Sequence, residues 1–565
     1  MDQTHFDTVI VGSGFGGSVM AYRLAEAGRE VCLLEKGKAY PPGSFLRSPY
    51  SAHDNFWNPK EGRYGLFDLW SFHRIHALVA SGLGGGSLVY ANVLLRKDEA
   101  WFVNEDLSQG GYENWPVTRA DLEPHYDRVE KMLSPKPYPF GHAPYSDTSK
   151  TQAFWTATRR AGLEPFFPGL AVTFANGDAA PVPGEPIHEA EPNLHGRTRL
   201  TCRLCGECDV GCNYGSKNTL DYTYLSAAAR CGAELRTGCE VKSFAPRDGG
   251  GYTVTYVEHP LTAAGPADES APSAAHTLTA DRLVLSAGAL GSTYLLLKNR
   301  IAFPRLSRQL GTRFSGNGDL LTFARKRPNA PSDPEMPAVI DPTYGPVITS
   351  AARVGDALDG DGSSGRGFYL EDAGFPAHLA WALQVMAAPG PLLNLLTQRF
   401  LWDWTGKGAD TRLGSQLASM LSGNTLAGGV LPLLGMGRDV PDGRLRLRAG
   451  RLDLDWNRRA SKDYFKRARA TSKRVAQELG ATFADNPIRY LNRLVTVHPL
   501  GGCPMGRNEE EGVVDSCGEV FNYPDLYVVD GAMMPGPVGS NPSLTIAALA
   551  DRCADRLLEG SRRHA

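Results

Sequence analysis

The stretch FDTVIVGSGFGGSVMAYRLAEAGREVCLLEK, residues 6–36, decides the fold, because it holds a strand, a glycine turn, a helix and a second strand in order. Gly12, Gly14 and Gly17 stand in G-x-G-x-x-G spacing. The first permits a tight turn, the second lets the backbone approach a pyrophosphate, and the third lets the helix pack on the strand. Glu35 closes the second strand and can accept hydrogen bonds from ribose hydroxyls. The stretch predicts a dinucleotide-binding α/β domain, and the carboxylate disfavours a cofactor with a 2′-phosphate.

A second glycine-rich loop follows in SGLGGGSLVYANVLL, Ser81–Leu95, directly after the strand-like run RIHALVA. Its three consecutive glycines, Gly84 to Gly86, let backbone amides approach a ligand without clashes from a Cβ atom. The loop runs on to Asn92, a polar residue among apolar ones. Two such loops suit a long dinucleotide that is held at two places.

Length and composition describe an ordinary globular protein of more than one domain, with 565 residues, 42% of them hydrophobic and 21% charged. The net charge of −2 gives no reason to expect a nucleic-acid partner. The N-terminus lacks the pattern of a secretory leader, and no apolar run reaches the roughly 18–20 residues of a membrane-spanning helix. We therefore expect a cytoplasmic protein whose ten cysteines are thiols or metal ligands rather than disulfides.

Four further motifs lie later in the chain. They are DRLVLSAGALGSTYLLL from Asp281, LGTRFSGNGD at Leu310–Asp319, TVHPLGGCPMG at Thr496–Gly506, and LYVVDGAMMPGPVGSNPSLTIAALADR at Leu526–Arg552. Together with the two glycine loops, these motifs resemble the glucose–methanol–choline (GMC) family of FAD-dependent oxidoreductases, and above all its cholesterol oxidase branch. The resemblance implies FAD as the cofactor and oxidation of an alcohol carbon by hydride transfer to flavin N5.

The resemblance also implies which residues contact FAD. Asp530 and Gly531 resemble the element at the flavin end, and Val241 resembles the position whose backbone meets the adenine. With the glycine loops, the residues expected to contact FAD are Gly12, Gly14, Phe15, Gly16, Gly17, Glu35, Lys36, Gly82, Gly85, Gly86, Ser87, Asn92, Val241, Ala287, Gly288, Asp530, Gly531, Asn541 and Pro542, while Asn317 and Asp319 match further FAD-side positions. We expect the FAD to be bound non-covalently.

Two polar residues stand in apolar, glycine-flanked turns near the C-terminus: His498 precedes Pro-Leu-Gly-Gly, and Asn541 lies in Gly-Ser-Asn-Pro. A histidine can take a hydroxyl proton while hydride leaves the same carbon. An asparagine offers a donor and an acceptor, and can orient the hydroxyl or polarise the flavin edge. A structural histidine in a turn is the ordinary alternative. By resemblance, however, His498 matches the active-site histidine of the family and Asn541 matches its active-site asparagine.

Glu371 lies in the middle of the strand-like run GFYLEDAGFP. A carboxylate at this place could simply face solvent. In cholesterol oxidases a comparable glutamate is the base that moves a double bond after the oxidation, and by this resemblance Glu371 is a third catalytic candidate. A hydrophobic pocket would raise the pKa of such a carboxyl and suit it to proton transfer. Whether the product is isomerised stays open.

The scattered motifs predict a discontinuous α/β, Rossmann-like FAD-binding domain made of residues 1–100, 215–320 and 490–565. The ranges 101–214 and 321–489 would form a substrate-binding region with a mostly antiparallel sheet and covering helices. The runs TYGPVIT, GFYLEDAG and RLRLRAGRLDLDW fit such strands, and RADLEPHYDRVEKML and SKDYFKRARATSKRVAQELG are amphipathic helices.

The stretch Ala377–Gly406 is apolar and aromatic, and LASMLSGNTLAGGVLPLLGMG follows it. Both stretches can be core helices of the substrate region. They can also form a hydrophobic lid for a greasy substrate that is taken from a membrane surface, which would be a peripheral contact. Either interpretation suits a sterol-sized alcohol better than a sugar, whose hydroxyls need more polar partners.

Four cysteines lie within eleven residues, because Cys202, Cys205, Cys208 and Cys212 follow C-x2-C-x2-C-x3-C spacing. An iron–sulfur cluster is one interpretation. In the bacterial ferredoxin run, however, the fourth cysteine ligates another cluster, so Cys212 would need a different path of the loop. Structural zinc is a second interpretation, although zinc sites usually join two separated C-x2-C pairs. A metal-free cysteine-rich loop is the third.

The sequence therefore predicts an FAD-dependent enzyme that oxidises a secondary hydroxyl of a sterol-like or other hydrophobic alcohol to a ketone and passes the electrons to oxygen. One alternative is an FAD and iron–sulfur alcohol dehydrogenase of a biosynthetic pathway, which passes electrons to a protein acceptor. The alternative from another class is a non-catalytic flavin-binding redox module. His498 and Asn541 argue against that last alternative.

Overall fold

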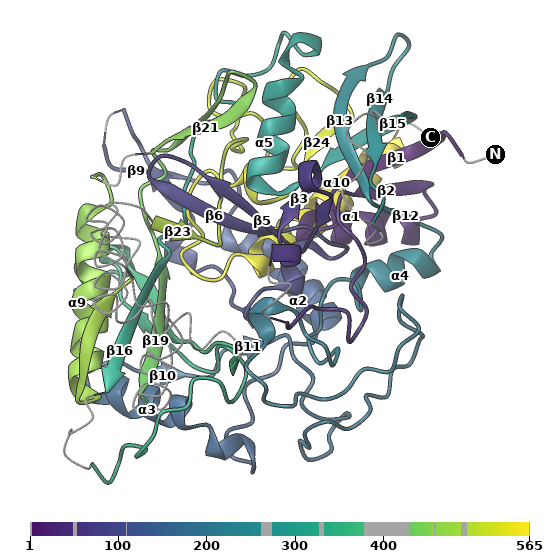
Figure 1. The fold of residues 1–565 in the computed structure, drawn as a ribbon. Helices are drawn as coiled ribbons and strands as arrows, with labels where there is room; N and C mark the ends of the chain where they lie inside the picture. The colour runs from purple at the N-terminus through teal and green to yellow at the C-terminus, as the bar shows by residue number, and fades with distance from the viewer. Residues whose placement is uncertain are drawn as a thin grey trace, which may run out of the picture.

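The structure of the chain is a computed structural model, and it describes residues 3–48, 53–108, 110–261, 274–326, 333–377, 429–456, 459–486 and 494–563. Two large hydrophobic cores organise these residues, one around a seven-stranded sheet and one around a six-stranded sheet (Figure 1). The apolar stretch 377–406 lies outside the described residues except for Ala377, so its role as a lid stays a prediction.

The seven-stranded sheet has the order β12-β2-β1-β15-β14-β13, and β24 pairs with the second half of β15. The strands are β1 (His5–Val11), β2 (Val31–Glu35), β12 (Glu234–Thr237), β13 (Cys239–Pro246), β14 (Tyr252–Glu258), β15 (Ala275–Leu285) and β24 (Leu526–Val528). β12, β2, β1, β15 and β24 are parallel, so their carboxyl ends meet at one edge, where ligands of such sheets bind. This is the Rossmann-like sheet that residues 6–36 predict.

Helices cover this sheet. They are α1 (Phe15–Glu26), α2 (Arg119–Leu133), α4 (Tyr224–Arg230), α5 (Gly288–Lys298) and α10 (Ser543–Arg563). α1 packs against α10 and α4, and α2 packs on α10. The apolar side of α1 includes Val19, Met20 and Leu24, which are fully buried, and its burial explains why the run after the glycines forms a helix here.

The six-stranded sheet is antiparallel throughout, with the order β10-β17-β18-β19-β16-β22. The strands are β10 (Pro165–Phe166), β16 (Leu320–Lys326), β17 (Ala351–Val354), β18 (Phe368–Asp372), β19 (Val430–Gly437) and β22 (Ala481–Asp485). Two helices pack on it, α9 (Lys462–Glu478) along β16 and β22, and α3 (Ser149–Arg160) on α9 and β18. Figure 1 shows α9 running beside β16 at the edge of the molecule. The predicted antiparallel sheet with covering helices is confirmed.

Three details of the predicted substrate region are wrong. TYGPVIT forms no strand, because Gly345 has φ +102° and the N–H of Thr349 donates to the Asp372 carboxylate rather than to a neighbouring strand. RLRLRAGRLDLDW forms the strands β20 (Arg444–Arg448) and β21 (Arg451–Asp455), but as a separate hairpin outside the six-stranded sheet. The end of the apolar run 417–437 is not helical, because it forms the central strand β19.

A three-stranded sheet, β5 (Phe67–Ser71), β6 (Ile75–Ala80) and β23 (Leu494–Thr496), lies between the two larger sheets in Figure 1. β6 and β23 are parallel, and β6 leads into the second glycine loop while β23 leads into His498. The short strands are β3 (Trp57–Asn58), β4 (Arg63–Tyr64), β7 (Val93–Leu94), β8 (Val103–Glu105), β9 (Tyr112–Asn114) and β11 (Gly169–Leu170). This sheet brings the second glycine loop and His498 to the same edge.

The predicted domain boundaries stay a prediction. All strands of the first sheet come from the ranges 1–100, 215–320 and 490–565. Helix α2 comes from the range assigned to the substrate region, yet its Tyr126 and Val129 belong to the core of the first sheet.

Candidate active site

Two glycine-rich loops lie against each other at the carboxyl edge of the parallel strands. Residues 12–17 join β1 to α1, and residues 82–87 follow β6. A Cβ atom at Gly85 would lie 2.7 Å from the Cα of Gly14, so the two loops touch backbone to backbone. A Cβ atom at Gly16 would lie 1.7 Å from the carbonyl oxygen of Val529, just before Asp530. The three segments predicted to meet FAD are therefore packed together.

Glu35 holds both glycine loops at the end of β2. Its buried carboxylate accepts hydrogen bonds from the N–H of Ser13 (3.1 Å), the Ser13 hydroxyl (2.7 Å) and the N–H of Gly37 (2.9 Å). The Ser13 hydroxyl in turn accepts from the N–H of Gly84 (3.0 Å). Three donors leave about one of the four acceptor sites of the carboxylate for a ribose hydroxyl.

Asp530 joins the end of β24 to the start of α5. Its carboxylate accepts hydrogen bonds from the N–H of Gly288 (2.8 Å), the N–H of Ala532 (2.7 Å) and the hydroxyl of Ser292. Burial raises the pKa of Asp530 to about 6, while these donors lower it. Ala287 and Gly288 therefore lie beside the Asp530–Gly531 element, as the predicted FAD contacts require.

The other predicted FAD contacts are spread over the same region. Asn92 is buried with φ +72°, and among the described residues neither end of its amide makes a hydrogen bond of ordinary geometry. The buried hydroxyl of Ser81 is equally unpaired in the described part of the chain. Lys36 forms an ion pair with Asp68, and Val241 is buried in β13.

These features fit FAD. The Cβ positions of Gly14, Gly86 and Gly288 have no atom within 4 Å, so the cradle is open along both loops. The N-terminus of α1 directs free N–H groups at a pyrophosphate in the first loop, and Glu35 would hold the ribose. The unpaired polar atoms of Ser81 and Asn92 offer further hydrogen bonds to a bound cofactor.

The segment Ser315–Asp319, which we name the hub, positions His498. The Nδ1 atom of His498 lies 2.8 Å from one carboxylate oxygen of Asp319. The other oxygen accepts from the N–H groups of Val497 (2.9 Å) and His498 (3.2 Å) and from the Thr496 hydroxyl (2.8 Å). Because Asp319 accepts the Nδ1 proton, we assign the tautomer in which Nε2 carries the free lone pair. His498 is held as a base whose Nε2 is available.

The hub also holds the turn that carries Asn541. The side chain of Asn317 donates to the carbonyl of Ser540 (2.9 Å) and accepts from the N–H of Gly539 (2.9 Å). Asn541 follows directly, is 6% exposed, and its side-chain oxygen has no partner among the described residues. Asn317 and Asp319 are two positions apart, so one short segment sets both catalytic candidates.

Two buried charged residues brace this arrangement. The carboxylate of Asp439 accepts from the hydroxyl of Ser315 and the N–H of Gly316, and burial raises its pKa to about 7. The ammonium of Lys97 donates to the carbonyls of Pro537 (2.8 Å) and Val538 (3.0 Å), just before the Asn541 turn. The sequence analysis did not select either residue, because each follows another charged residue, Arg96 or Arg438, and nothing local marks it as buried.

Glu371 is fully buried in β18, so it does not face solvent. Neither carboxylate oxygen has a hydrogen-bond partner of ordinary geometry in the described part of the chain. Burial raises the pKa of Glu371 well above its usual value, although the Asn541 side chain opposes the shift, and the charges of Asp372 and Asp319 add to it. The structure thus brings Glu371 beside Asn541, with Asp319 near enough to act on its charge.

We expect Asp319→Asn to lower the rate constant of substrate-driven flavin reduction by at least about tenfold, because the amide no longer fixes the Nδ1–H tautomer of His498. The variant keeps the size of the side chain, and its FAD content should stay that of the parent. Anaerobic stopped-flow spectroscopy measures both. A variant with full FAD and an unchanged rate would show that the pair does not position the base.

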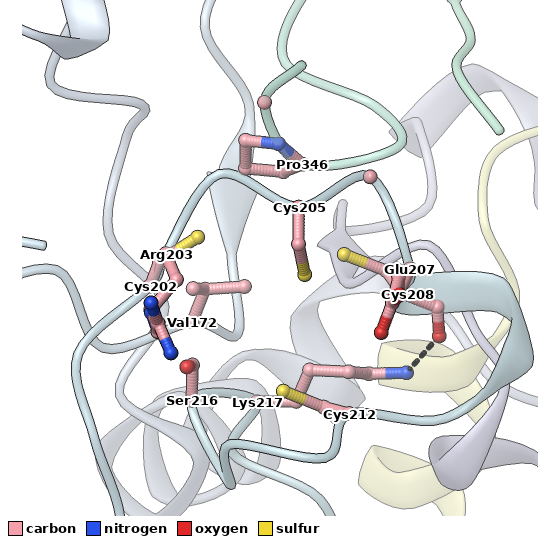
Figure 2. A pocket seen from close by; sticks show the side chains of 12 residues that line it. Val172, Cys202, Arg203, Cys205, Glu207, Cys208, Cys212, Ser216, Lys217 and Pro346 are labelled. Carbon is pink, nitrogen blue, oxygen red and sulfur yellow. Dashed lines mark hydrogen bonds between the residues drawn. The ribbon is translucent and has the colours of Figure 1, made fainter. Parts of the chain in front are cut away.

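The four cysteines line one pocket, with Val172, Lys217 and Pro346 among its other walls (Figure 2). All ten cysteines of the chain are free thiols. Figure 2 shows the sulfur atoms of Cys205 and Cys208 directed toward each other, and that of Cys212 directed into the same space beside Lys217. The structure therefore brings together all four predicted metal-ligating residues.

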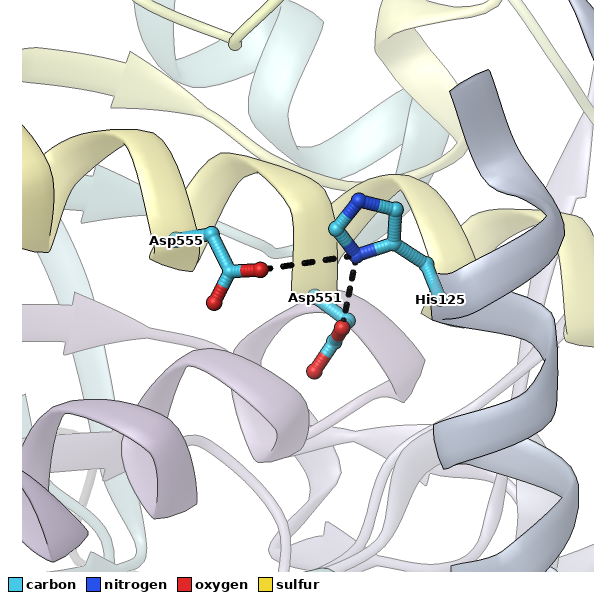
Figure 3. A group of neighbouring side chains, drawn as sticks. All are labelled: His125, Asp551 and Asp555. Atoms are coloured by element: carbon cyan, nitrogen blue, oxygen red, sulfur yellow. Dashed lines mark hydrogen bonds and ion pairs between the residues drawn. The ribbon is translucent and has the colours of Figure 1, made fainter. Parts of the chain in front are cut away.

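A second group, His125, Asp551 and Asp555, has ligand atoms close enough for a metal ion (Figure 3). It joins α2 to α10, and Nδ1 of His125 lies 2.7 Å from Asp551. Arg23 and Arg128 already form ion pairs with both carboxylates. Because two guanidinium groups neutralise the carboxylates, we interpret this cluster as an ion-pair network that holds three helices together.

Family models match three parts of the chain. Two GMC oxidoreductase models match residues 187–313 and 439–550, and a model of an NAD(P)-binding Rossmann-like domain matches residues 10–43. The matched residues include the first glycine loop, the four cysteines, Gly288, His498 and Asn541, while the hub lies between the two GMC models. The chain belongs to the GMC oxidoreductases and is an FAD-dependent enzyme that acts on CH–OH groups.

Known relatives point to one branch of the family. The chain is 28% identical to a cholesterol oxidase of Mycobacterium tuberculosis, over 97% of this chain and 90% of that protein. It is 27% identical to a cholesterol oxidase of Acinetobacter baumannii, over 97% and 93%. It is also 23% identical to a long-chain-alcohol oxidase of Arabidopsis thaliana, over 98% of this chain and 67% of that protein. The cholesterol oxidase-like branch is thereby confirmed.

Solved structures agree on the fold. A pyridoxine 4-oxidase structure superposes with a TM-score of 0.55 at 17% identity, and covers 98% of this chain and 99% of that one. Among the described helices, none combines the length and the apolar character that crossing a bilayer requires.

Proposed function

We propose that the chain oxidises a secondary hydroxyl of a sterol-like or other hydrophobic alcohol to a ketone. The observation that supports the proposal is the hub, because Asp319 binds the ring of His498 and Asn317 binds the two residues before Asn541. The identity to cholesterol oxidases and to a long-chain-alcohol oxidase supports the hydrophobic class of alcohol. The site residues themselves stay a prediction.

His498, Asp319 and Asn541 have different roles in the proposed oxidation. Nε2 of His498 takes the hydroxyl proton, and the charge of Asp319 stabilises the imidazolium that forms. Asn541 donates a hydrogen bond that orients the hydroxyl or the flavin edge. When bound, FAD accepts the hydride that leaves the alcohol carbon. Glu371 and Asn541 are buried, which limits the access of water to these two side chains.

Reduced FAD is proposed to pass its electrons to oxygen and release hydrogen peroxide. The oxidases among the relatives support this acceptor. A second candidate is an FAD and iron–sulfur dehydrogenase with a protein acceptor, which the pocket of four cysteines favours. The test is to assay the purified enzyme with cholesterol, long-chain alcohols and sugars as substrates, and to measure ketone and peroxide. Peroxide release at the rate of ketone formation supports the oxidase, while turnover only with a one-electron dye supports the dehydrogenase.

We expect Glu371→Gln to abolish any double-bond isomerisation of a Δ5-sterol product while it leaves the oxidation rate within about tenfold, because the amide cannot accept the proton. The pKa of Glu371 is raised, so its base form grows as the pH rises. The isomerised fraction should therefore increase with pH in the parent and stay absent in the variant. Chromatography of the two ketones measures the fraction. An equal fraction in parent and variant would contradict the role.

Uptake of the substrate from a membrane surface is the part of the proposal that rests on the apolar stretch 377–406. That stretch lies outside the described residues, so the proposal keeps only its sequence-based support.

A further inference from the structure

The cysteine loop is held in one shape by close contacts. Gly211 has φ +89°, and a Cβ atom there would lie 2.1 Å from the ring of Phe45. Gly206 has φ +68°, and a Cβ atom there would lie 2.5 Å from the carbonyl oxygen of Thr343. These two glycines turn the chain around the pocket, so that Cys212 lines the same space as the first three cysteines.

The path of the loop explains how Cys212 can bind the same cluster as the other three cysteines, although the C-x2-C-x2-C-x3-C spacing alone argues against it. In a two-cluster ferredoxin the fourth cysteine of the run points to another cluster. Here the turn at Gly211 brings Cys212 back to the pocket that Cys202, Cys205 and Cys208 line (Figure 2). The run therefore supplies four thiols to one place.

The spacing of the sulfur atoms decides between two kinds of metal site. Four thiolates on one zinc ion at about 2.3 Å stand about 3.8 Å apart from one another. Among the described residues, no three of these cysteines bring their sulfur atoms within 4.8 Å of one another. A four-iron cluster takes one thiolate on each iron and so spreads its ligands more widely. The sulfur atoms therefore stand further apart than one zinc ion would hold them, which disfavours zinc.

We propose that Cys202, Cys205, Cys208 and Cys212 together bind one [4Fe–4S] cluster. The site lies against the second glycine loop, because the ammonium of Lys217 donates to the carbonyls of Cys208 (2.7 Å), Leu88 (3.0 Å) and Tyr90 (2.8 Å). The statement that the cluster lies near FAD rests on the proposed function, because it assumes that the second glycine loop binds FAD. Occupancy of the pocket is independent of the substrate and of the electron acceptor.

The test is iron, zinc and acid-labile sulfide analysis of the full chain, purified without oxygen, with electron paramagnetic resonance after reduction by dithionite. We expect about four irons and four sulfides per chain. Cys208→Ser and Cys212→Ser should each lose most of the iron, while Cys231→Ser, an exposed cysteine outside the loop, keeps it. FAD content and Tm are measured in every variant to detect misfolding.

Three results would overturn the proposal: about one zinc per chain, no metal in a chain with full FAD, or unchanged iron in Cys212→Ser. If the serine variants do not fold, the parent chain is stripped by a chelator and mixed with ferrous iron and sulfide under argon. Return of the cluster absorption with about four irons supports the proposal, and failure to take up iron contradicts it. Flavin reduction by alcohols, measured on the same preparation, tests the proposed function separately.

Discussion

Replacing His498 by glutamine is expected to lower the rate constant of flavin reduction by an alcohol by about 10²–10⁴-fold. The glutamine keeps a polar side chain but cannot take the hydroxyl proton as hydride leaves the carbon. Asp319 would keep its hydrogen bonds from Thr496 and Val497, so the backbone of the turn should hold. Anaerobic stopped-flow spectroscopy of the bound flavin measures the rate constant.

His188→Gln is the matched control, because His188 is exposed and lies outside the site. That variant should reduce its flavin at the rate of the parent. If His498→Gln retained full FAD and lost less than about threefold in rate, a residue other than His498 would have to be the base.

Replacing Asn541 by alanine is expected to lower the same rate constant by about 10²–10³-fold, the usual cost of removing one placed donor from an active site. Asn541 is buried, and Asn317 fixes the two residues before it. Its amide is thus held in place before the substrate binds, and alanine removes the donor without disturbing the hub. The loss should fall on the rate constant rather than on the affinity for FAD.

Asn508→Ala, at an exposed turn, is the control for this substitution. The FAD content and Tm of both variants establish that they are folded. An Asn541→Ala enzyme that bound FAD weakly but reduced the bound fraction at the rate of the parent would assign Asn541 to cofactor binding instead.

Local sequence predicted the parts of the fold that local forces control. The glycine spacing, the apolar strands and the helix of residues 6–36 all point to the same structure, which is why β1, α1 and β2 agree with it. The strand predicted for TYGPVIT is absent because backbone groups of this stretch bond to side chains. The N–H of Thr349 donates to Asp372, and the carbonyl of Val347 accepts from Lys150. The pattern of apolar and polar residues in a sequence does not reveal hydrogen bonds between backbone groups and distant side chains.

The candidate site was predictable as a set of residues but not as an arrangement. Motifs named His498 and Asn541, yet Asp319 lies 179 positions before His498, and its carboxylate reaches Nδ1 only in the fold. Glu371 could not be placed from its strand, because β18 is buried on both faces and lacks alternation. The cysteine spacing named four thiols, but only the turn at Gly211 brings them to one pocket.

The most direct test of the account is anaerobic flavin reduction by cholesterol and by cholesterol that carries deuterium on the carbinol carbon. The account predicts that the flavin is reduced to completion, that deuterium slows the reduction, and that His498→Gln slows it far more. If cholesterol, long-chain alcohols and other secondary alcohols all left the flavin oxidised, the assignment of a hydrophobic alcohol as the substrate would be wrong.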